Sequence, residues 1–487
     1  MPQVVNSNIS ALSTQRNLNR SQADLTTSLQ RLSSGLRINS AKDDAAGLAI
    51  ADRMTAQIRG LNQAVRNAND GISIAQVAEG ALGEVTNALQ RMRELAVQSA
   101  NDTNSATDRA SLQKEVSALA QEITRLATQT QFNGKNLLDG SFGNGVFQIG
   151  AYSGQTISFG IGSAKATDIG SNTASSNANV GAAPAASATV GSNGVAAQTL
   201  TVSGTTGTAA VSITADASAR GIAAAVNGVS ATTGVTATAR TEATISNLGE
   251  AGTVSFKLYG SNTTGVDISA NVVNKDDLSA LSDAINAKAS STGITAELSS
   301  DKKSIKLVSA EGYDIKVGDF TTSAATTTTV SIAGTSIDGA SGSTTDSIVV
   351  GGKVSFSSPT AFSVTSNDTT NTVLAAETAS SSLSSVGGIN IGTQTGASSA
   401  LDVIDGALSF VDNLRADLGA VQNRFDSVVA SGQATAENVS AARSRIQDAD
   451  FAAETANLSR AQILQQAGTA MLAQANQQSQ NVLSLLR

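Results

Sequence analysis

The sequence "AQILQQAGTAMLAQANQQSQNVLSLLR", Ala461–Arg487, ends the chain and carries a regular apolar stripe almost to its last residue. Chain ends are usually polar and frayed, because an end that packs against nothing keeps its conformational entropy. Here steps of three and four residues connect Ala461, Leu464, Gly468, Met471, Ala475, Gln478, Val482 and Leu485. This spacing is typical of a coiled-coil helix, which gains stability by burying its stripe against a partner.

The other faces of this helix carry almost no charge. After Glu454, the only charged side chains are Arg460 and Arg487. A two-helix coiled coil normally keeps Glu and Lys beside its seam, where they hold it in solution and select its partner. The uncharged back therefore predicts burial on more than one side, and we expect the chain to associate with copies of itself.

The N-terminal third repeats the pattern. Its first stripe connects Ala11, Gln15, Leu18, Gln22, Leu25, Leu29, Leu32 and Leu36. Further stripes over 58–96, 112–126 and 404–428 predict three longer helices. We expect the first helix to continue through Asn67–Gly71 and the second to be capped by Thr107 or Asp108. A cap-and-turn region at 431–440 is expected to follow the third. We expect residues 4–36 to pair with 450–487 and the longer helices to form a bundle. Periodicity alone leaves open an ordinary helical bundle with a large inserted loop domain.

The composition excludes several classes of function. Charged residues make up 14%, the net charge is -8, and the chain has no His and no Cys. Acidic chains lack the excess of Lys and Arg that neutralises phosphates, so we expect no nucleic-acid partner. Without His and Cys, the commonest general base and the strongest nucleophile are missing, and we expect neither an enzyme nor a metal or cofactor.

The pair Asp43-Asp44 is the nearest approach to a catalytic carboxylate cluster. Neighbouring residues on a helix point about 100° apart, so these two do not share a site. We interpret Ser40 and Asp43 instead as a capping box that opens the helix after it. We also expect no membrane contact, because no run reaches the roughly 18 apolar residues of a span, and no cleaved signal peptide, because the first residues have neither a basic leader nor an apolar core.

The middle of the chain changes character. Short β-like runs appear at Val146–Ile149 and Ile157–Ile161, and beyond Gly170 the sequence is rich in Ser, Thr, Ala and Gly. Residues Ile222–Ala239 align without a gap with Leu281–Leu298, which predicts two copies of one small helix-plus-strands module. Residues 330–394 are expected to form exposed β structure, whose hydroxyls are more simply explained by solvation than as sites for sugars.

These observations predict a fold class and a division of the chain. The fold is mainly an α rod, a coiled coil and helical bundle built from both termini, with inserted α+β or β-rich variable domains. Terminal arms take residues 1–44 with 450–487, a helical rod bundle with a β-hairpin takes 45–169 with 396–449, and the insertion takes 170–395, with two subdomains expected.

Five segments together resemble the terminal signatures of bacterial flagellin. They are Leu32–Met54 ("LSSGLRINSAKDDAAGLAIADRM"), Asn67–Leu82, Glu94–Asp102, Phe132–Gly140 and Arg445–Gln477. The resemblance covers about residues 1–165 and 395–487, and the repeated module resembles one found in the variable insertion of many flagellins. It implies a structural subunit that polymerises into the flagellar filament for swimming, with both termini lining the inner tube and the insertion facing outward.

The resemblance also implies a route and a set of partners. Flagellins leave the cell unfolded through a flagellum-specific type III pathway, with a secretion chaperone, a filament cap and hook-junction proteins as partners. The inter-subunit and coiled-coil core would then contain Leu18, Leu25, Leu29, Leu32, Leu36, Leu464, Met471, Val482, Leu485 and Leu486. Residues 1–36 are expected to be disordered in the monomer, because alone they bury too little area to offset ordering.

Three further residues match positions through which many flagellins engage Toll-like receptor 5. They are Arg91, Leu95 and Glu115. The alternative is that they form inter-subunit contacts on the rod, and both roles can hold together. Alternative functions for the whole chain are a hook-filament junction or cap-type axial protein, or a surface adhesin. An enzyme lodged in the insertion is disfavoured by the missing His and Cys.

Overall fold

The computed structural model describes residues 7–177, 183–185, 191–323, 329–340, 343, 345–368, 370, 373–374 and 376–484. The predicted Leu485 and Leu486 therefore lie outside the described residues, as does the side chain of Val482. Two compact units divide the chain. The first contains Met1–Val77, Gly143–Gly160 and Asp417–Arg487, and the second contains Ala78–Phe142 and Ile161–Ala416.

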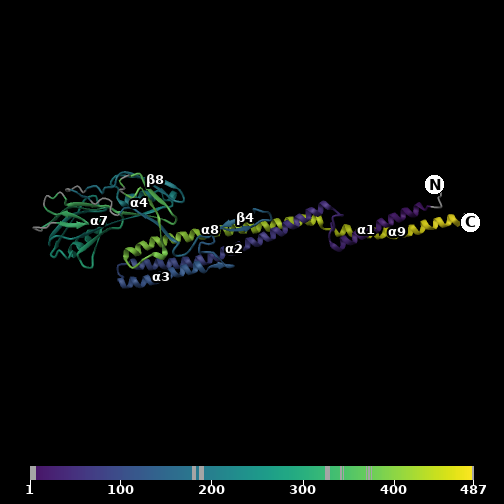
Figure 1. Ribbon diagram of the computed structural model, residues 1–487, viewed down its shortest axis with the longest axis horizontal. Helices are drawn as coiled ribbons and strands as arrows, with labels where there is room; N and C mark the ends of the chain where they lie inside the picture. Colours follow the sequence, from purple (N-terminus) through teal and green to yellow (C-terminus); the bar gives the residue numbers. More distant parts are fainter. Residues whose placement is uncertain are drawn as a thin grey trace. The chain divides into compact units, whose positions relative to one another are not determined.

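The first unit is helical. It holds α1 (Ile9–Ser34), α9 (Phe451–Ser484), the first part of α2 (Ala45–Ala100), the last part of α8 (Gln394–Gln447) and the hairpin β3 (Gly145–Gln148) and β4 (Thr156–Phe159). Figure 1 shows α1 and α9 side by side. The Asn8 side chain caps α1 by accepting from Ala11 N, and Gly35 ends it in the left-handed conformation at φ 72°.

Helix α2 begins at a different cap from the one expected. The carboxylate of Asp44 accepts from Gly47 N at 2.8 Å, one residue before the helix. Asp43 instead accepts from the backbone N and hydroxyl of Ser40 and closes the turn that precedes α2. The capping-box interpretation was therefore wrong, because both bonds lie before the helix. These hydrogen bonds hold the pKa of Asp43 below its ordinary value, and the bond from the Ser40 backbone has the largest effect.

Helix α2 continues through residues 67–71, as predicted, and a close contact explains the glycine there. A Cβ on Gly71 would lie 2.7 Å from Cζ of Phe425, which is fully buried. Phe425 meets the rings of Phe147 and Phe159 edge-on, at centroid distances of 5.5 and 6.0 Å. This aromatic cluster fixes the β3–β4 hairpin on the two long helices.

Helix α8 contradicts the cap-and-turn predicted at 431–440, since it is continuous to Gln447. Its glycine has a packing role there, because a Cβ on Gly432 would lie 3.1 Å from Cγ2 of Val65. The helix stops next to the α1 terminus. Arg37 N donates to Gln447 O at 2.7 Å, Ala449 N donates to Gly35 O at 2.9 Å, and Leu36 forms a β-bridge with Asp448.

The second unit combines a helical bundle with the β-rich insertion. The bundle contains the last part of α2, the first part of α8, and α3 (Ala106–Gln129), beside the short pair β1 (Gln131–Phe132) and β2 (Lys135–Asn136). Ser105 caps α3 in a capping box with Asp108, so the predicted N-cap at Thr107 or Asp108 was two or three residues late. Large side chains buried here include Leu82, Leu89, Met92, Leu95 and Ile123.

Three larger sheets are formed by the described residues of the insertion. A five-stranded sheet has the order β11 (Val266–Val272), β10 (Gly252–Tyr259), β14 (Ile315–Thr322), β17 (Ser347–Val350), β6 (Ala183–Ala185). An eight-stranded sheet has the order β12 (Thr295–Leu298), β13 (Ser304–Ser309), β9 (Thr236–Ser246), β18 (Lys353–Ser358), β5 (Gly170–Ser175), β21 (Ser382–Ser385), with β15 (Thr329–Ile332) pairing both β9 and β16 (Thr335–Asp338). A four-stranded sheet has the order β20 (Thr378–Ser380), β19 (Ser363–Ser366), β7 (Gln198–Ser203), β8 (Thr208–Ile213), and a 3-10 turn, η1 (Val386–Gly388), leads back to α8.

Each copy of the sequence repeat forms the same local unit. The first copy contains α4 (Ala219–Asn227), α5 (Ser230–Thr233) and the start of β9, and the second contains α6 (Ser279–Asn286), α7 (Ala289–Thr292) and β12. In the first copy the Asn227 amide donates to Ala237 O at 2.8 Å and accepts from Ala237 N at 2.7 Å. In the second, Asn286 makes the same two bonds with Ala296, both at 2.8 Å.

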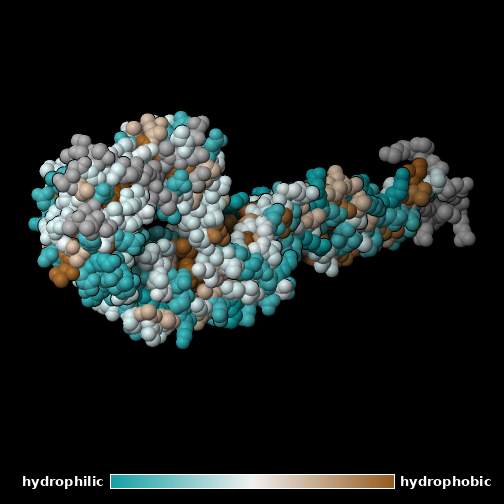
Figure 2. Space-filling view, turned by 60° about the vertical axis from the view of Figure 1, so that its left-hand side comes forward, coloured by the Kyte–Doolittle hydropathy of each residue, from teal (hydrophilic) through white to brown (hydrophobic). Residues whose placement is uncertain are grey.

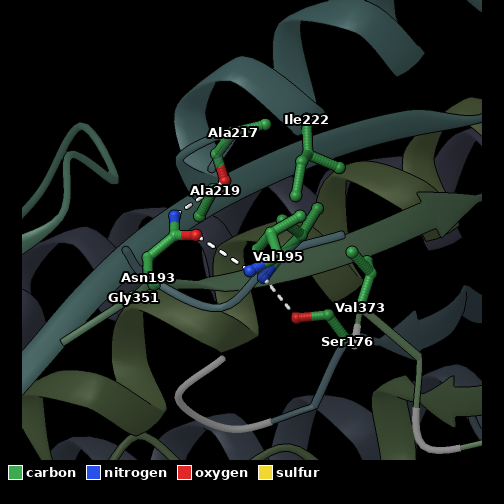
Figure 3. A pocket seen from close by; sticks show the side chains of 10 residues that line it. Ser176, Asn193, Val195, Ala217, Ala219, Ile222, Gly351 and Val373 are labelled. Carbon is green, nitrogen blue, oxygen red and sulfur yellow. Dashed lines mark hydrogen bonds between the residues drawn. The ribbon is translucent and has the colours of Figure 1, made fainter. Parts of the chain in front are cut away.

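The described residues of the insertion form two hydrophobic cores, one for each copy of the repeat. The first includes Leu200, Val202, Ile222 and Phe356, and the second includes Val254, Phe256, Leu281 and Ile305. Figure 3 shows the hydrogen bonds of Asn193 beside residues of the first core, among them Val195 and Ile222. There Asn193 Nδ2 donates to Ala217 O at 3.0 Å, and Asn193 Oδ1 accepts from Val195 N at 3.0 Å. The prediction of long terminal helices with an inserted β-rich region is confirmed.

Candidate functional site

The terminal helix pair, α1 and α9, is the candidate site for association. The two helices run antiparallel, since Asn8 Nδ2 donates to Ala475 O at 2.9 Å near one end and Arg31 pairs with Glu454 at 3.8 Å near the other. Midway, Gln465 Nε2 donates to Gln22 Oε1 at 2.6 Å. A Cβ on Gly468 would lie 3.1 Å from Cδ1 of Leu18, so the missing side chain lets α1 approach closely.

Burial identifies the residues that form the seam of the terminal helix pair. On α1 the buried or half-buried stripe is Ala11, Thr14, Leu18, Ser21, Leu25, Ser28 and Leu32, and on α9 it is Glu454, Leu458, Ala461, Gln465, Gly468, Leu472 and Ala475. Both stripes keep alternating steps of three and four. The predicted Leu18, Leu25 and Leu32 lie in this seam, and Leu36 is half-buried just beyond α1.

Three predicted seam residues lie outside it. Leu29 is 50% exposed, Leu464 is 51% exposed and Met471 is 60% exposed. The prediction that they share one stripe with the other leucines was wrong. In the seam, the neighbouring residues Ser28, Gln465 and Leu472 take the places predicted for Leu29, Leu464 and Met471. The apolar side chains that revealed the periodicity therefore point partly away from the partner helix within the same chain.

The terminal helix pair has an unusual share of exposed apolar surface. Among the described residues, thirteen large hydrophobic side chains are exposed, and seven of them lie on α1 or α9: Ile9, Leu12, Leu29, Phe451, Ile463, Leu464 and Met471. Figure 2 shows brown apolar surface along this part of the chain. Sequence reasoning missed Ile9, Leu12, Phe451 and Ile463, and the signal that could have found them is large apolar residues beside the seam.

A polar groove of about 220 Å³ lies between α1 and α9 at the end nearer Gly35. Asp24 and Arg31 line it from α1, and Glu454 and Arg460 line it from α9. Glu454 is only 8% exposed, and Arg31 is its ion-pair partner. A half-buried pair of this kind adds little stability but penalises shifted registers, in which one charge would lose its partner.

The predicted receptor residues separate into two environments. Arg91 Nη1 lies 2.9 Å from Glu94, its Nη2 lies 2.9 Å from Glu115, and all three side chains are about half-exposed or more. The hydrogen bonds that Arg91 donates to Glu94, first, and to Glu115 raise the pKa of the guanidinium. Leu95, by contrast, is 1% exposed. The expectation that Leu95 contributes to a surface contact was therefore wrong, since its side chain belongs to the bundle core.

Two features are absent from the part of the chain that the structure describes. No helix there combines the length and apolar character needed to cross a membrane. In the same part of the chain, no group of three or more acidic side chains gathers closely enough to hold a metal ion.

Family models match most of the chain. The model of the bacterial flagellin N-terminal helical region matches residues 5–143, and that of the C-terminal helical region matches residues 401–486. A third model, the flagellin hook IN motif, matches twice, over residues 199–248 and 253–311. These two matches contain the two copies of the repeat that the sequence shows.

Whole-chain relatives agree with the family models. The B-type flagellin of Pseudomonas aeruginosa is 46% identical over 498 aligned residues, and the flagellin of Salmonella typhimurium is 39% identical over 523, with both chains covered completely in each case. The solved structure of FliC from Burkholderia pseudomallei is 26% identical, covers 73% of this chain and 99% of its own, and has a TM-score of 0.30. The chain belongs to the bacterial flagellin family.

Proposed function

We propose that this flagellin polymerises through the outer faces of its terminal helix pair. A flagellin is a structural subunit of the bacterial flagellar filament, so the chain must present surfaces that bind further copies of itself. The observation that carries the proposal is the concentration of exposed large hydrophobic side chains on α1 and α9. Soluble proteins rarely leave such side chains clustered unless another surface covers them.

The proposal assigns two roles to the predicted core residues. Leu18, Leu25, Leu32 and Leu36 hold α1 against α9 or against the segment next to it, within one subunit. The second set contacts neighbouring subunits and consists of Leu29, Leu464, Met471, Val482, Leu485 and Leu486, of which the last three lie outside the described side chains. Contacts of this head-to-tail kind do not close, which permits growth of a polymer.

Burial energies support assembly of this kind. Covering a Leu or Met side chain contributes about 1.5–3 kcal/mol when burial is complete. Leu29, Leu464 and Met471 are half-exposed or more, so each has roughly 1 kcal/mol still to gain. Contributions of this size are modest in one subunit, but each subunit of a helical polymer makes the same contacts.

The finer assignments rest on the family resemblance. We propose export through the flagellar type III route with a secretion chaperone, growth beneath a filament cap on hook-junction proteins, and an extracellular filament. The insertion faces outward there, and the chain has a structural role and no catalytic one. The terminal arms are ordered only on assembly, so strong amide protection of residues 7–36 in the monomer would contradict this part of the proposal.

Arg91 and Glu115 are proposed to serve both a contact between subunits and recognition by Toll-like receptor 5. The exposed ion pair that they form supports this, because both side chains remain accessible. Arg91→Ala is expected to weaken receptor signalling. Arg125→Ala is the matched control, since Arg125 forms an equally exposed pair with Glu122. Unchanged potency of the Arg91 variant would remove the receptor assignment.

Electron microscopy of the purified protein under assembly conditions tests the main proposal. Long tubes are expected, whereas short caps or the absence of any polymer would favour a relative such as a cap or junction protein. Deletion of residues 480–487 should leave a monomer whose bundle and insertion keep their far-UV circular dichroism. Polymerisation of this truncated chain at normal efficiency would contradict the proposed role of the terminus.

A further inference from the structure

An open cleft of about 630 Å³ lies in the second unit, between a sheet face of the insertion and the first turns of α8. The sheet face is formed by the adjacent strands β13, β9 and β18. Thr395 and Ser399 line the cleft from α8, and the hairpin residues Ala333 and Gly334 line one side. The volume is in the range of pockets that hold small molecules.

The outer face of this sheet carries an excess of positive charge. Along β9, Arg240 and Glu242 alternate with Thr241 and Ala243, which are buried on the other face. Lys306 of β13 and Lys353 of β18 join them in lining the cleft. Three cationic side chains therefore face a single carboxylate, in a chain whose net charge is -8.

The single carboxylate is already shared. Glu242 accepts from Arg240 Nε at 2.7 Å and pairs with Lys306 Nζ at 2.9 Å, while Lys353 has no ion-pair partner in the described part of the chain. Lys353 and Arg240 are also direct cross-strand partners in the β18–β9 register. Like charges placed directly opposite each other destabilise a sheet, unless an anion lies between them.

The remaining lining groups narrow the class of anion. Thr244, Ser355, Thr395 and Ser399 supply hydroxyl groups, which can both donate and accept hydrogen bonds. Among the residues that the structure describes, no aromatic side chain lines the cleft, so a planar base or ring would have no described aromatic ring to stack on. The cleft is also much larger than a bare inorganic anion requires. Cations together with hydroxyl groups fit a molecule that combines negative charge with several hydroxyls of its own.

We propose that this cleft binds an acidic sugar, either free or as the terminal unit of a glycan. The carboxylate of the sugar lies between Lys353 and Arg240 and relieves their repulsion, and the hydroxyls on β9, β18 and α8 bind the ring hydroxyls. Binding at this site is separate from the proposed association through α1 and α9, because its residues lie in the insertion and at the start of α8, whereas α1 and α9 belong to the other compact unit.

Titration of the full-length monomer by isothermal calorimetry tests the proposal, with glucuronic acid, glucose and inorganic phosphate as probes. Glucuronic acid is expected to bind, glucose at least tenfold more weakly, and phosphate more weakly than glucuronic acid. A glucuronic-acid-terminated oligosaccharide that binds more tightly than the free sugar identifies a glycan end as the ligand, and equal affinity identifies the free sugar. Phosphate as tight as glucuronic acid, or glucose as tight as either, would overturn the assignment.

Variants locate the binding. Lys353→Gln removes one charge without breaking an ion pair and is expected to weaken glucuronic acid binding roughly tenfold, the effect of losing one charge-assisted hydrogen bond. Lys303→Gln is the control, since Lys303 is a 60% exposed lysine of the insertion that pairs with Asp276 and does not line the cleft. Equal affinity of the Lys353 variant and the wild type would refute the site, and thermal melting confirms that both variants are folded.

Discussion

Replacement of Ile463 by serine tests whether the outer face of α9 is an assembly surface. Ile463 lies beside the seam and is 65% exposed, so serine there leaves the contact with α1 intact. Ile and Ser have similar helix propensities, and the substitution therefore changes the helix itself little. We expect the stability of the monomer to stay within about 0.5 kcal/mol of the wild type, as for most surface substitutions.

The expected effect on assembly follows from the area that remains to be covered. Complete burial of Ile contributes roughly 2–2.5 kcal/mol, and about two thirds of the side chain is still exposed once α1 and α9 are paired within a subunit. Covering it in the polymer therefore contributes about 1.5 kcal/mol per subunit. Because 1.4 kcal/mol corresponds to about a factor of ten in an equilibrium constant, Ile463→Ser should raise the critical concentration for polymerisation about tenfold.

The assay is seeded growth followed by sedimentation, in which the protein left in the supernatant gives the critical concentration. Gln462→Ser is the matched control, because Gln462 is also exposed on α9 but is polar. It should polymerise like the wild type. If Ile463→Ser and Gln462→Ser have the same critical concentration as the wild type, this face of α9 is solvated in the polymer and the reasoning is refuted.

Two further predictions concern stability. Gly71→Ala should lower the unfolding free energy by about 1–2 kcal/mol in calorimetry, since its Cβ would lie 2.7 Å from the buried ring of Phe425, whereas Gly83→Ala, with nothing within 4 Å, should be neutral or stabilising by up to about 1 kcal/mol. Hydrogen bonds from Ser141 lower the pKa of Asp139 from 3.8 to about 2, so its stabilising contribution is complete above pH 4 and is lost as the pH falls through 2. Asp139→Ala should therefore lower the melting temperature at pH 7 and approach the wild type near pH 2, and an equal deficit at both values would contradict this.

The sequence predicted the elements of the fold better than their ends. The stripe of α2 kept its phase through Asn67–Gly71, and this correctly outweighed local turn chemistry, because the contact of Gly71 with Phe425 is a tertiary feature. At 431–440 the local turn chemistry was misleading, because Gly432 marks close helix packing there and not a turn. A glycine within a periodic segment is thus ambiguous until its partner is known.

The candidate sites were predictable only in part, for geometric reasons. Arg91 and Leu95 are four residues apart, which places them about 40° apart around a helix. That difference is enough to expose the guanidinium to Glu115 and bury Leu95 at 1%. The acidic-sugar cleft carried no sequence signal, because Arg240, Lys306 and Lys353 become neighbours only through the pairing of β13, β9 and β18.

The one-residue error in the seam of the terminal helix pair follows from how its helices are built. On such a helix, a second stripe with the same steps of three and four can be drawn one residue away from the first. The prediction followed the second stripe at Leu29, Leu464 and Met471, because their side chains are larger or more apolar than those in most of the seam layers. The seam instead takes small or polar side chains such as Ser28 and Gln465 in alternate layers, which permit close approach. A helix that needed only one partner would have little use for leucines beside its seam. Two adjacent apolar phases on one helix are what a subunit needs if it must bury one stripe within itself and offer the other to its neighbours.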